Sequence, residues 1–179
     1  GFVDGLVLVA SGAGGHTGLT AGFAFVEEVR QFWDGPIALG GAISSGRAIR
    51  AAETLGAELA YLGTAFIACE ESIADPAYKD MVVGANVEDI LPSKGITGVT
   101  ANWLRKSLIA AGYDPANMPE DKKPNFENTQ DNSKAWKNVW SAGQGVGAVT
   151  AIEPVAQIVA RLKAEYDFAC KLPRFDMKE

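Results

Sequence analysis

Three short apolar runs, each followed by a glycine-containing loop, constrain the fold of this chain more than any other feature. They begin at Leu6, Ile37 and Leu59, and a segment with helical spacing separates each run from the next. Uninterrupted apolar runs of this length are typical of strands that are buried on both faces of a parallel sheet. Strands that alternate with helices along the chain therefore predict an α/β fold with a parallel sheet.

The two helices between these strands have recognisable ends. After Thr20, which we expect to cap the first helix, apolar residues recur at helical spacing as far as Trp33. Ser45 is the predicted N-cap of the second helix, because its hydroxyl can accept a hydrogen bond from an N–H group of the first turn. Gly56 is expected to end that helix, since glycine readily adopts the left-handed conformation that follows many helices.

The pattern changes after Glu70, and the alternation of strand and helix becomes irregular. The expected elements are a short helix at 78–83, a strand within 89–98, helices at 101–111 and 135–140, a long polar loop or lid at 114–132, and a helix that opens at Glu153-Pro154.

The composition is that of a globular protein and argues against several classes of partner. Of the 179 residues, 47% are hydrophobic and 21% are charged, and the formal net charge is −6. An acidic chain lacks the basic stripe of a nucleic-acid surface. No apolar run approaches the roughly 18 residues of a membrane-spanning helix. We therefore expect neither a nucleic acid nor a membrane as partner.

The two cysteines, Cys69 and Cys170, lie far apart and have no metal-ligand spacing. With a single histidine and no cysteine cluster, the chain is not expected to build a metal site. Two reduced, structural thiols are typical of a cytoplasmic protein, which is the expected localisation.

Two neighbouring loops carry a clear sign of a ligand site. Gly40-Gly41 and Gly63-Thr64 both follow predicted strands, whose carboxyl ends lie at one edge of a parallel sheet. Backbone N–H groups from two such loops can surround one phosphate group, and glycine permits close approach because it lacks a Cβ. This arrangement is expected after the last two strands of a (β/α)8 barrel, where the Thr64 hydroxyl can add a donor. The alternative is that both loops are only tight turns.

The only histidine lies in a third glycine-rich loop, at 11–18. On a barrel this loop opens on the same face as the two phosphate loops, so His16 would point toward the same cavity. Imidazole suits proton transfer near neutral pH, which makes His16 a candidate for catalysis or ligand contact. The alternative is a surface or capping histidine. Gln144, between Gly143 and Gly145, is a candidate to bind a flavin or phosphate oxygen, or it only begins a helix.

Five segments in combination extend this reading: AGGHTG at 13–18, GGAI at 40–43, LGTAF at 62–66, ES at 71–72 and AGQ at 142–144. Together they resemble the nitronate monooxygenases, formerly called 2-nitropropane dioxygenases. The resemblance covers the chain from Gly1 to about Ala169. An FMN-type enoyl-acyl-carrier-protein reductase and a group of NADH:quinone reductases share the same framework. Gly12 departs from the pattern, since much of the family has an acidic residue there.

The resemblance implies a (β/α)8 TIM barrel with bound FMN, of which this chain holds the last three βα units and a small inserted α/β lid domain. Residues 1–74 would form the barrel units, 75–138 the lid domain, and 139–179 the return to the barrel. The implied site consists of His16 as the catalytic residue and of Gly14, Gly40, Gly41, Gly63, Thr64 and Gln144 as FMN ligands.

The same resemblance implies that the first five strands of the barrel are absent from these residues. Three parallel strands leave an open edge and cannot close, so we expect the remaining strands to come from a preceding segment or by association, with a homo-oligomer as one form of it.

The implied reaction is the FMN-dependent oxidation of alkyl nitronates or nitroalkanes by O2 to a carbonyl compound and nitrite. One alternative is an FMN-dependent NAD(P)H reductase that acts on a quinone or an enoyl thioester. Another is a truncated fragment without catalytic activity.

Overall fold

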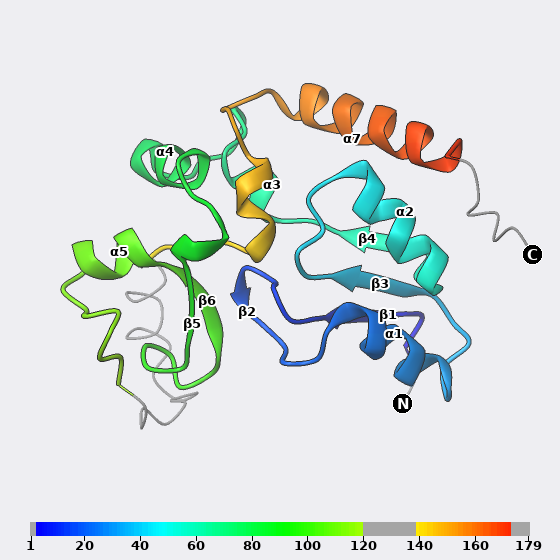
Figure 1. Ribbon diagram of the computed structural model, residues 1–179, viewed down its shortest axis with the longest axis horizontal. Coiled ribbons are helices and arrows are strands. Elements are labelled where there is room, and N and C mark those ends of the chain that lie inside the picture. The colour runs from blue at the N-terminus through cyan, green and yellow to red at the C-terminus, as the bar shows by residue number, and fades with distance from the viewer. Residues whose placement is uncertain (1–2, 120–138, 173–179) are drawn as a thin grey trace, which may run out of the picture.

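Three parallel strands form the first sheet, in the order β1–β3–β4 (Figure 1). They are β1 (Leu6–Val9), β3 (Ile37–Gly40) and β4 (Leu59–Tyr61). In the register of the sheet Leu8 lies opposite Leu39, and Ala38 lies opposite Leu59. This computed structural model describes residues 3–119 and 139–172. The parallel α/β arrangement predicted from the sequence is confirmed.

Two helices cover one face of this sheet: α1 (Gly22–Arg30) and α2 (Gly46–Leu55). The core between helices and sheet consists of the buried residues Leu8, Ala10, Val26, Val29, Ile37, Leu39, Ala52 and Ala57. The cap of α2 is confirmed, because Ser45 Oγ accepts a hydrogen bond from the N–H of Ala48 at 3.2 Å. Its end is confirmed as well, because Gly56 has a φ of 104°.

The predicted cap of α1 is wrong. The N-cap is Ala21, and no side chain caps the helix. Thr20 belongs to the preceding loop instead, where its carbonyl oxygen accepts a hydrogen bond from the N–H of Ser11 at 2.8 Å. That bond closes the glycine-rich loop after β1 and sets the start of α1 one residue later.

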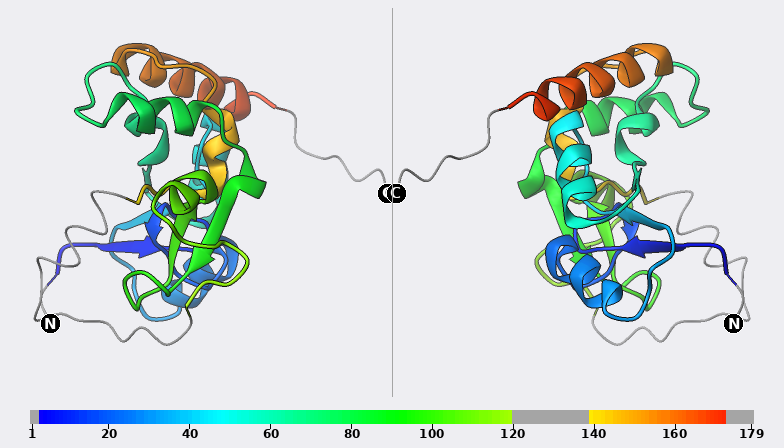
Figure 2. Two further views of the ribbon diagram at one scale, coloured as in Figure 1. Left: turned by 90° about the vertical axis from the view of Figure 1, so that its left-hand side faces the viewer. Right: turned by 90° about the vertical axis from the view of Figure 1, so that its right-hand side faces the viewer.

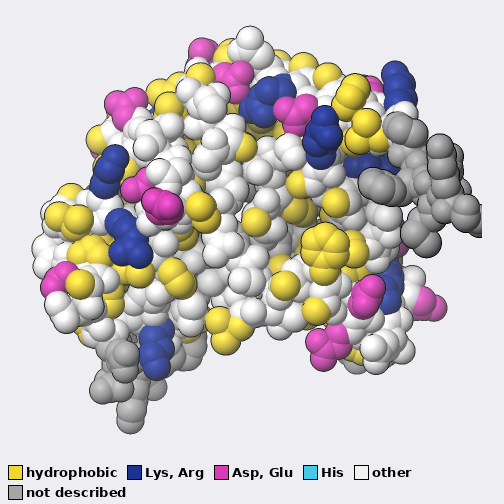
Figure 3. All heavy atoms as spheres, in the orientation of Figure 1, with side chains coloured by type: hydrophobic (Ala, Val, Ile, Leu, Met, Phe, Trp, Pro, Cys, Tyr) yellow, Lys and Arg dark blue, Asp and Glu magenta, His cyan; other side chains and the backbone are white. Residues whose placement is uncertain are grey.

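The opposite face of the sheet is open, so the prediction of strands buried on both faces is wrong for the described residues. Val7 and Leu59 are 58% and 62% exposed, and Val9 and Tyr61 are exposed with them. In Figure 3 hydrophobic side chains lie near the centre of the view, where Figure 1 draws the carboxyl ends of β3 and β4. An apolar run in the sequence shows that a strand is apolar on both faces, but it does not show which segment covers each face.

The last described helix, α7 (Val155–Cys170), lies along α2 (Figure 1). Buried Ile158 and Leu162 of α7 pack with Cys69. The carboxylate of Glu165 accepts a hydrogen bond from the N–H of Gly46 at 2.8 Å, at the first turn of α2. The helix predicted after Glu153-Pro154 is confirmed.

A second, antiparallel sheet has the strand order β2–β6–β5. Its strands are β2 (Gly15–His16), β5 (Ile90–Ser93) and β6 (Ala101–Leu104). Around it lie α3 (Thr64–Ile67), α4 (Pro76–Val83), α5 (Arg105–Ala110) and the 3-10 helices η1 (Val87–Asp89) and η2 (Gln144–Ala148). Figure 2 shows the molecule from its two ends, with the green strands and α5 nearest in one view and α1 and α2 nearest in the other.

The helix predicted at 101–111 is wrong for its first four residues, which form β6. All four are buried, and the two faces of the strand enter different cores. Trp103 packs with Ile96 and Leu108, whereas Leu104 packs with another cluster that includes Val82. A strand covered on both faces has no polar alternation, so its side chains matched helical spacing equally well.

The other predictions for this half have mixed outcomes. The helix at 78–83 and the strand within 89–98 are confirmed as α4 and β5. The part of the loop predicted at 114–132 that follows residue 119 lies outside the described residues. Residues 135–138 of the helix predicted at 135–140 lie outside them as well, and Val139 and Trp140 are not helical. No helix within 3–119 and 139–172 has the length and apolar character needed to cross a membrane.

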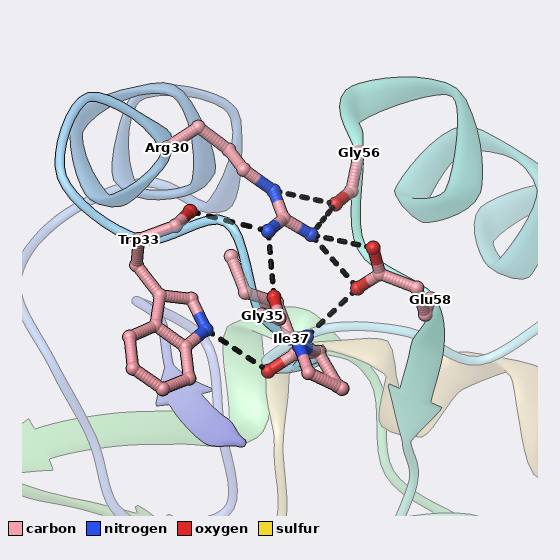
Figure 4. A network of polar contacts seen from close by, with 7 residues as sticks. Arg30, Trp33, Gly35, Ile37, Gly56 and Glu58 are labelled. Atoms are coloured by element: carbon pink, nitrogen blue, oxygen red, sulfur yellow. Dashed lines mark hydrogen bonds and ion pairs between the residues drawn. The ribbon is translucent and has the colours of Figure 1, made fainter. Parts of the chain in front are cut away.

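Arg30 forms a polar network that connects the segments after α1 and α2 with the amino ends of β3 and β4 (Figure 4). Its guanidinium donates to the carbonyl oxygens of Gly56 and Gly35 and pairs with both carboxylate oxygens of Glu58, at 2.7 and 2.8 Å. Glu58 in turn accepts a hydrogen bond from the N–H of Ile37 at 2.8 Å. This network fixes the amino ends of β3 and β4 and leaves their carboxyl ends for the site.

Candidate active site

A cavity of about 350 Å³ lies at the carboxyl ends of the three parallel strands. The loops that follow β1, β3 and β4 line it, together with the loop around η2. The structure places six of the seven predicted site residues in its wall: Gly14, His16, Gly40, Gly41, Gly63 and Thr64. Gln144 is exposed and does not belong to the lining. Its predicted role stays a prediction.

Close packing between loops explains two of these glycines. A Cβ at Gly14 would lie 2.7 Å from the backbone nitrogen of Gly143. A Cβ at Gly41 would lie 2.9 Å from the carbonyl oxygen of Ala10, and Gly41 has a φ of 128°. A side chain at either position would therefore push apart the loops that form the cavity wall.

Gly63 has a different environment. A Cβ at this position would meet no described atom within 4 Å, and its φ of −127° is accessible to other residues. Neither packing nor backbone conformation therefore requires glycine here. The missing side chain leaves open space at Gly63, a residue of the cavity lining directly before Thr64.

The same loops present free hydrogen-bond donors. Among the described residues, no acceptor is bonded to the backbone N–H groups of Gly41, Ala42, Gly63 and Thr64. The Thr64 hydroxyl oxygen accepts a hydrogen bond from the N–H of Gly143 at 2.9 Å, so its own proton is available to a second partner. The described lining contains no Lys, Arg, Asp or Glu, so an anion in this part of the cavity would be bound by backbone amides and hydroxyl groups.

His16 belongs to the strand β2, which pairs with β6 of the second sheet. His16 lies opposite Ala101, and the N–H of Thr17 donates to the carbonyl oxygen of Thr100 at 3.1 Å. The histidine therefore follows β1 along the chain, but the second sheet holds its backbone. Its residue is exposed and borders the cavity.

The loop around η2 closes one side of the cavity and is anchored by the loop after β1 and by α4. The N–H of Gln144 donates to the carbonyl oxygen of Gly12 at 2.9 Å. Tyr78 of α4 donates its hydroxyl proton to the carbonyl oxygen of Ser141 and accepts from the N–H of Ser141 at 3.3 Å. Its ring stacks on Trp140 with centroids 5.0 Å apart. Burial raises the pKa of the Tyr78 hydroxyl, which keeps it protonated as a donor.

Sequence reasoning missed several residues of the wall, among them Ala42, Ser44, Tyr61 and Ser141. Tyr61 ends β4 and Ser44 follows β3, so the rule that strand ends face one cavity could have found both. Ser141 carried no such signal, because its place depends on Tyr78. In the described ranges, no three His, Cys, Asp or Glu side chains gather as a metal ion would require.

Comparisons with known proteins agree with this arrangement. A family model described as nitronate monooxygenase matches residues 2–165, which confirms the resemblance seen in the sequence. A nitronate monooxygenase of Paraburkholderia phytofirmans is 30% identical over an alignment that covers 91% of this chain and 49% of that protein. One of Pseudomonas aeruginosa is 27% identical, with 90% of this chain and 51% of that protein covered.

Two solved structures have similar folds. FabK from Thermotoga maritima matches with a TM-score of 0.73 and 26% identity, covering 94% of this chain and 56% of the other. A nitroalkane oxidase from Streptomyces ansochromogenes matches with a TM-score of 0.73 and 26% identity, covering 93% and 52%. The chain thus spans about half the length of the relatives it matches.

Proposed function

Because the chain belongs to the nitronate monooxygenase family, we propose that its cavity binds FMN and that the protein oxidises alkyl nitronates or nitroalkanes with O2. The observation that carries the proposal is the free space at Gly63 beside four unbonded backbone N–H groups. A phosphate group needs such a space, and amides are its usual partners where no cation is present.

The residues fit the group that the family implies. Gly40, Gly41, Gly63 and Thr64 would hold the phosphate of FMN, with the Thr64 hydroxyl as one more donor. Gly14 would lie along the flavin, where the loop after β1 borders the cavity. Bound FMN would supply the electron-transfer chemistry that protein side chains lack.

His16 is the residue for which we propose a direct part in the reaction. With a neutral nitroalkane, a ring nitrogen of His16 takes the proton from the carbon that bears the nitro group. With an anionic nitronate no proton has to be removed, and the protonated imidazole stabilises the negative charge. The products are a carbonyl compound and nitrite.

The test uses the full-length protein that contains this sequence, loaded with FMN and given a nitronate in air. Nitrite formation is the expected result, and bound FMN without nitrite would contradict the proposal. The variant His16→Asn should keep the flavin but lose turnover of neutral nitroalkanes. Unchanged turnover of the nitroalkane would show that His16 is not the base.

A reductase is a second candidate, favoured by the similarity to FabK at the same TM-score as to the nitroalkane oxidase. Such an enzyme would take electrons from NAD(P)H and reduce a quinone or an enoyl thioester. Rapid loss of flavin colour on anaerobic addition of NADH would support it. A protein that never takes up flavin would support a fragment without catalytic activity.

We also propose that β1, β3 and β4 are the last three strands of a (β/α)8 barrel, with 1–74 and 139–179 in the barrel and 75–138 in a smaller lid domain. The exposed face that carries Val7, Val9, Leu59 and Tyr61 supports this, because side chains of barrel strands alternate between the interior and the helices. The other strands would come from a preceding segment or from association, and the whole would work in the cytoplasm.

A further inference from the structure

Asn102 is a buried polar residue inside an otherwise apolar strand. It is 1% exposed, and its neighbours Ala101, Trp103 and Leu104 in β6 are buried as well. In the second sheet it lies opposite Gly15, and Ala101 lies opposite His16. Asn102 thus stands beside the backbone that carries the only histidine of the chain.

The side chain of Asn102 connects the second sheet to the loop that follows β1. Its Nδ2 donates a hydrogen bond to the carbonyl oxygen of Ala13 at 2.8 Å. Ala13 lines the cavity and precedes Gly14. Together with the pairing of β2 and β6, this bond holds the loop at two places on either side of Gly14.

The other half of the same amide is unused. Asn102 Oδ1 is fully buried and has no hydrogen-bond partner among the described residues. Leu104, two residues on and therefore on the same face of the strand, packs with Ala142 and Val146. An apolar side chain would fit this face without a buried, unpaired acceptor, so packing does not explain the asparagine. The bond to Ala13 does.

We propose that Asn102 is a positioning residue, which fixes residues 13–16 of the loop so that the His16 imidazole is held at the cavity. The proposal rests on the proposed function, in which His16 is the base. Asn102 itself touches neither substrate nor cofactor in this role. Its effect on the reaction passes through the bond to Ala13 and the strand β2.

The test follows the imidazole directly. A ¹H–¹³C spectrum of histidine-labelled, full-length protein includes the His16 signal, and the variant His16→Asn identifies which signal it is. Asn102→Ala removes the amide, and Asn102→Asp keeps its shape but replaces the donor nitrogen by oxygen. The control is Thr97→Val, which deletes a buried hydroxyl of the same antiparallel unit. Within the described residues, this hydroxyl bonds only to the carbonyl oxygen of Val99, at 3.0 Å.

We expect the His16 signal to shift and broaden in both Asn102 variants and to keep its position in Thr97→Val. In the same variants, kcat for a neutral nitroalkane should fall about 10- to 100-fold with little change in KM, because small displacements of a catalytic group have effects of this size. Turnover of the anionic nitronate, which needs no proton transfer, should fall less.

The two proposals fail in different ways. A His16 signal that stays in place in both folded Asn102 variants overturns the positioning role, whatever the activity. A signal that moves while kcat for the nitroalkane stays the same supports the positioning role and contradicts the role of His16 as base. If Asn102→Ala does not fold, the position of the His16 signal in the isosteric variant Asn102→Asp tests the positioning role instead.

Discussion

The substitution Gly63→Ala should separate ligand binding from stability. In the structure the added methyl group would meet no described atom within 4 Å, and Gly63 belongs to the lining of the cavity. Gly63 is the N-cap of α3, and alanine is a poorer N-cap than glycine by a few tenths of a kcal/mol or more. Alanine also lowers the entropy of the unfolded chain, which stabilises by about 0.4–1 kcal/mol. The two effects oppose each other, so the free energy of unfolding without flavin should change by less than about 1 kcal/mol.

Binding of FMN should suffer far more. The methyl group would keep the phosphate away from the N–H groups of Gly63 and Thr64. A hydrogen bond to a charged group is worth about 1.5–3 kcal/mol, so the loss of one such bond corresponds to an increase in Kd of about 10- to 100-fold.

The assay is a titration of the flavin-free, full-length protein with FMN, followed by flavin fluorescence, beside urea unfolding of the same preparation. Gly84→Ala is the matched control. Gly84 ends α4 outside the cavity, has a φ of −87°, and its Cβ would make only an ordinary contact of 3.4 Å with the carbonyl oxygen of Asp80. Equal FMN affinity in the two variants would refute the placement of the phosphate at Gly63. A large loss of stability in Gly63→Ala would refute the claim that the space is free.

Two further predictions concern the network around Arg30. Arg30→Met should lower the free energy of unfolding by about 2 kcal/mol, because carbonyl oxygens such as that of Gly56 lose their charged hydrogen-bond donor. Urea unfolding measures this loss. The control Arg50→Met removes a surface ion pair and should leave the urea midpoint unchanged. The bond from the N–H of Ile37, followed by the contact with Arg30, lowers the pKa of Glu58 from its ordinary 4.5. Glu58 therefore stabilises the fold above pH 4.5, and this contribution is lost as the pH falls below 4.5 through the lowered pKa. Stability of Glu58→Gln should fall less steeply over that acid range, and parallel acid curves would contradict the assignment.

Local chemistry made part of this fold predictable from the sequence. Ser45 and Gly56 act through bonds to their own helix, so residue type alone identified them. The glycine loops after β3 and β4 were predictable for a related reason, since in a parallel sheet the direction of the strands decides where their ends meet. These rules bring six of the seven predicted site residues into one cavity wall without knowledge of any distant contact.

Features that depend on distant contacts could not be predicted in this way. The bond from Asn102 to Ala13 spans 89 positions, and nothing near Asn102 in the sequence indicates it. The strand β6 looked helical because both of its faces are buried, each against a different core. Thr20 was predicted as a cap from its residue type and position. The hydrogen bond that its carbonyl oxygen accepts from the N–H of Ser11 has no sequence signature, so its place in the loop could not be predicted.

The two-residue strand β2 also limits how members of this family can recombine. A crossover near residue 75 would take β6 from one parent and β2 from the other, although the two strands share one ladder. The backbone of His16 would then depend on whether a foreign strand offers the same register. The segment around the histidine and the hairpin of β5 and β6 should therefore be inherited as a pair, and a chimaera for enzyme engineering should exchange both or neither.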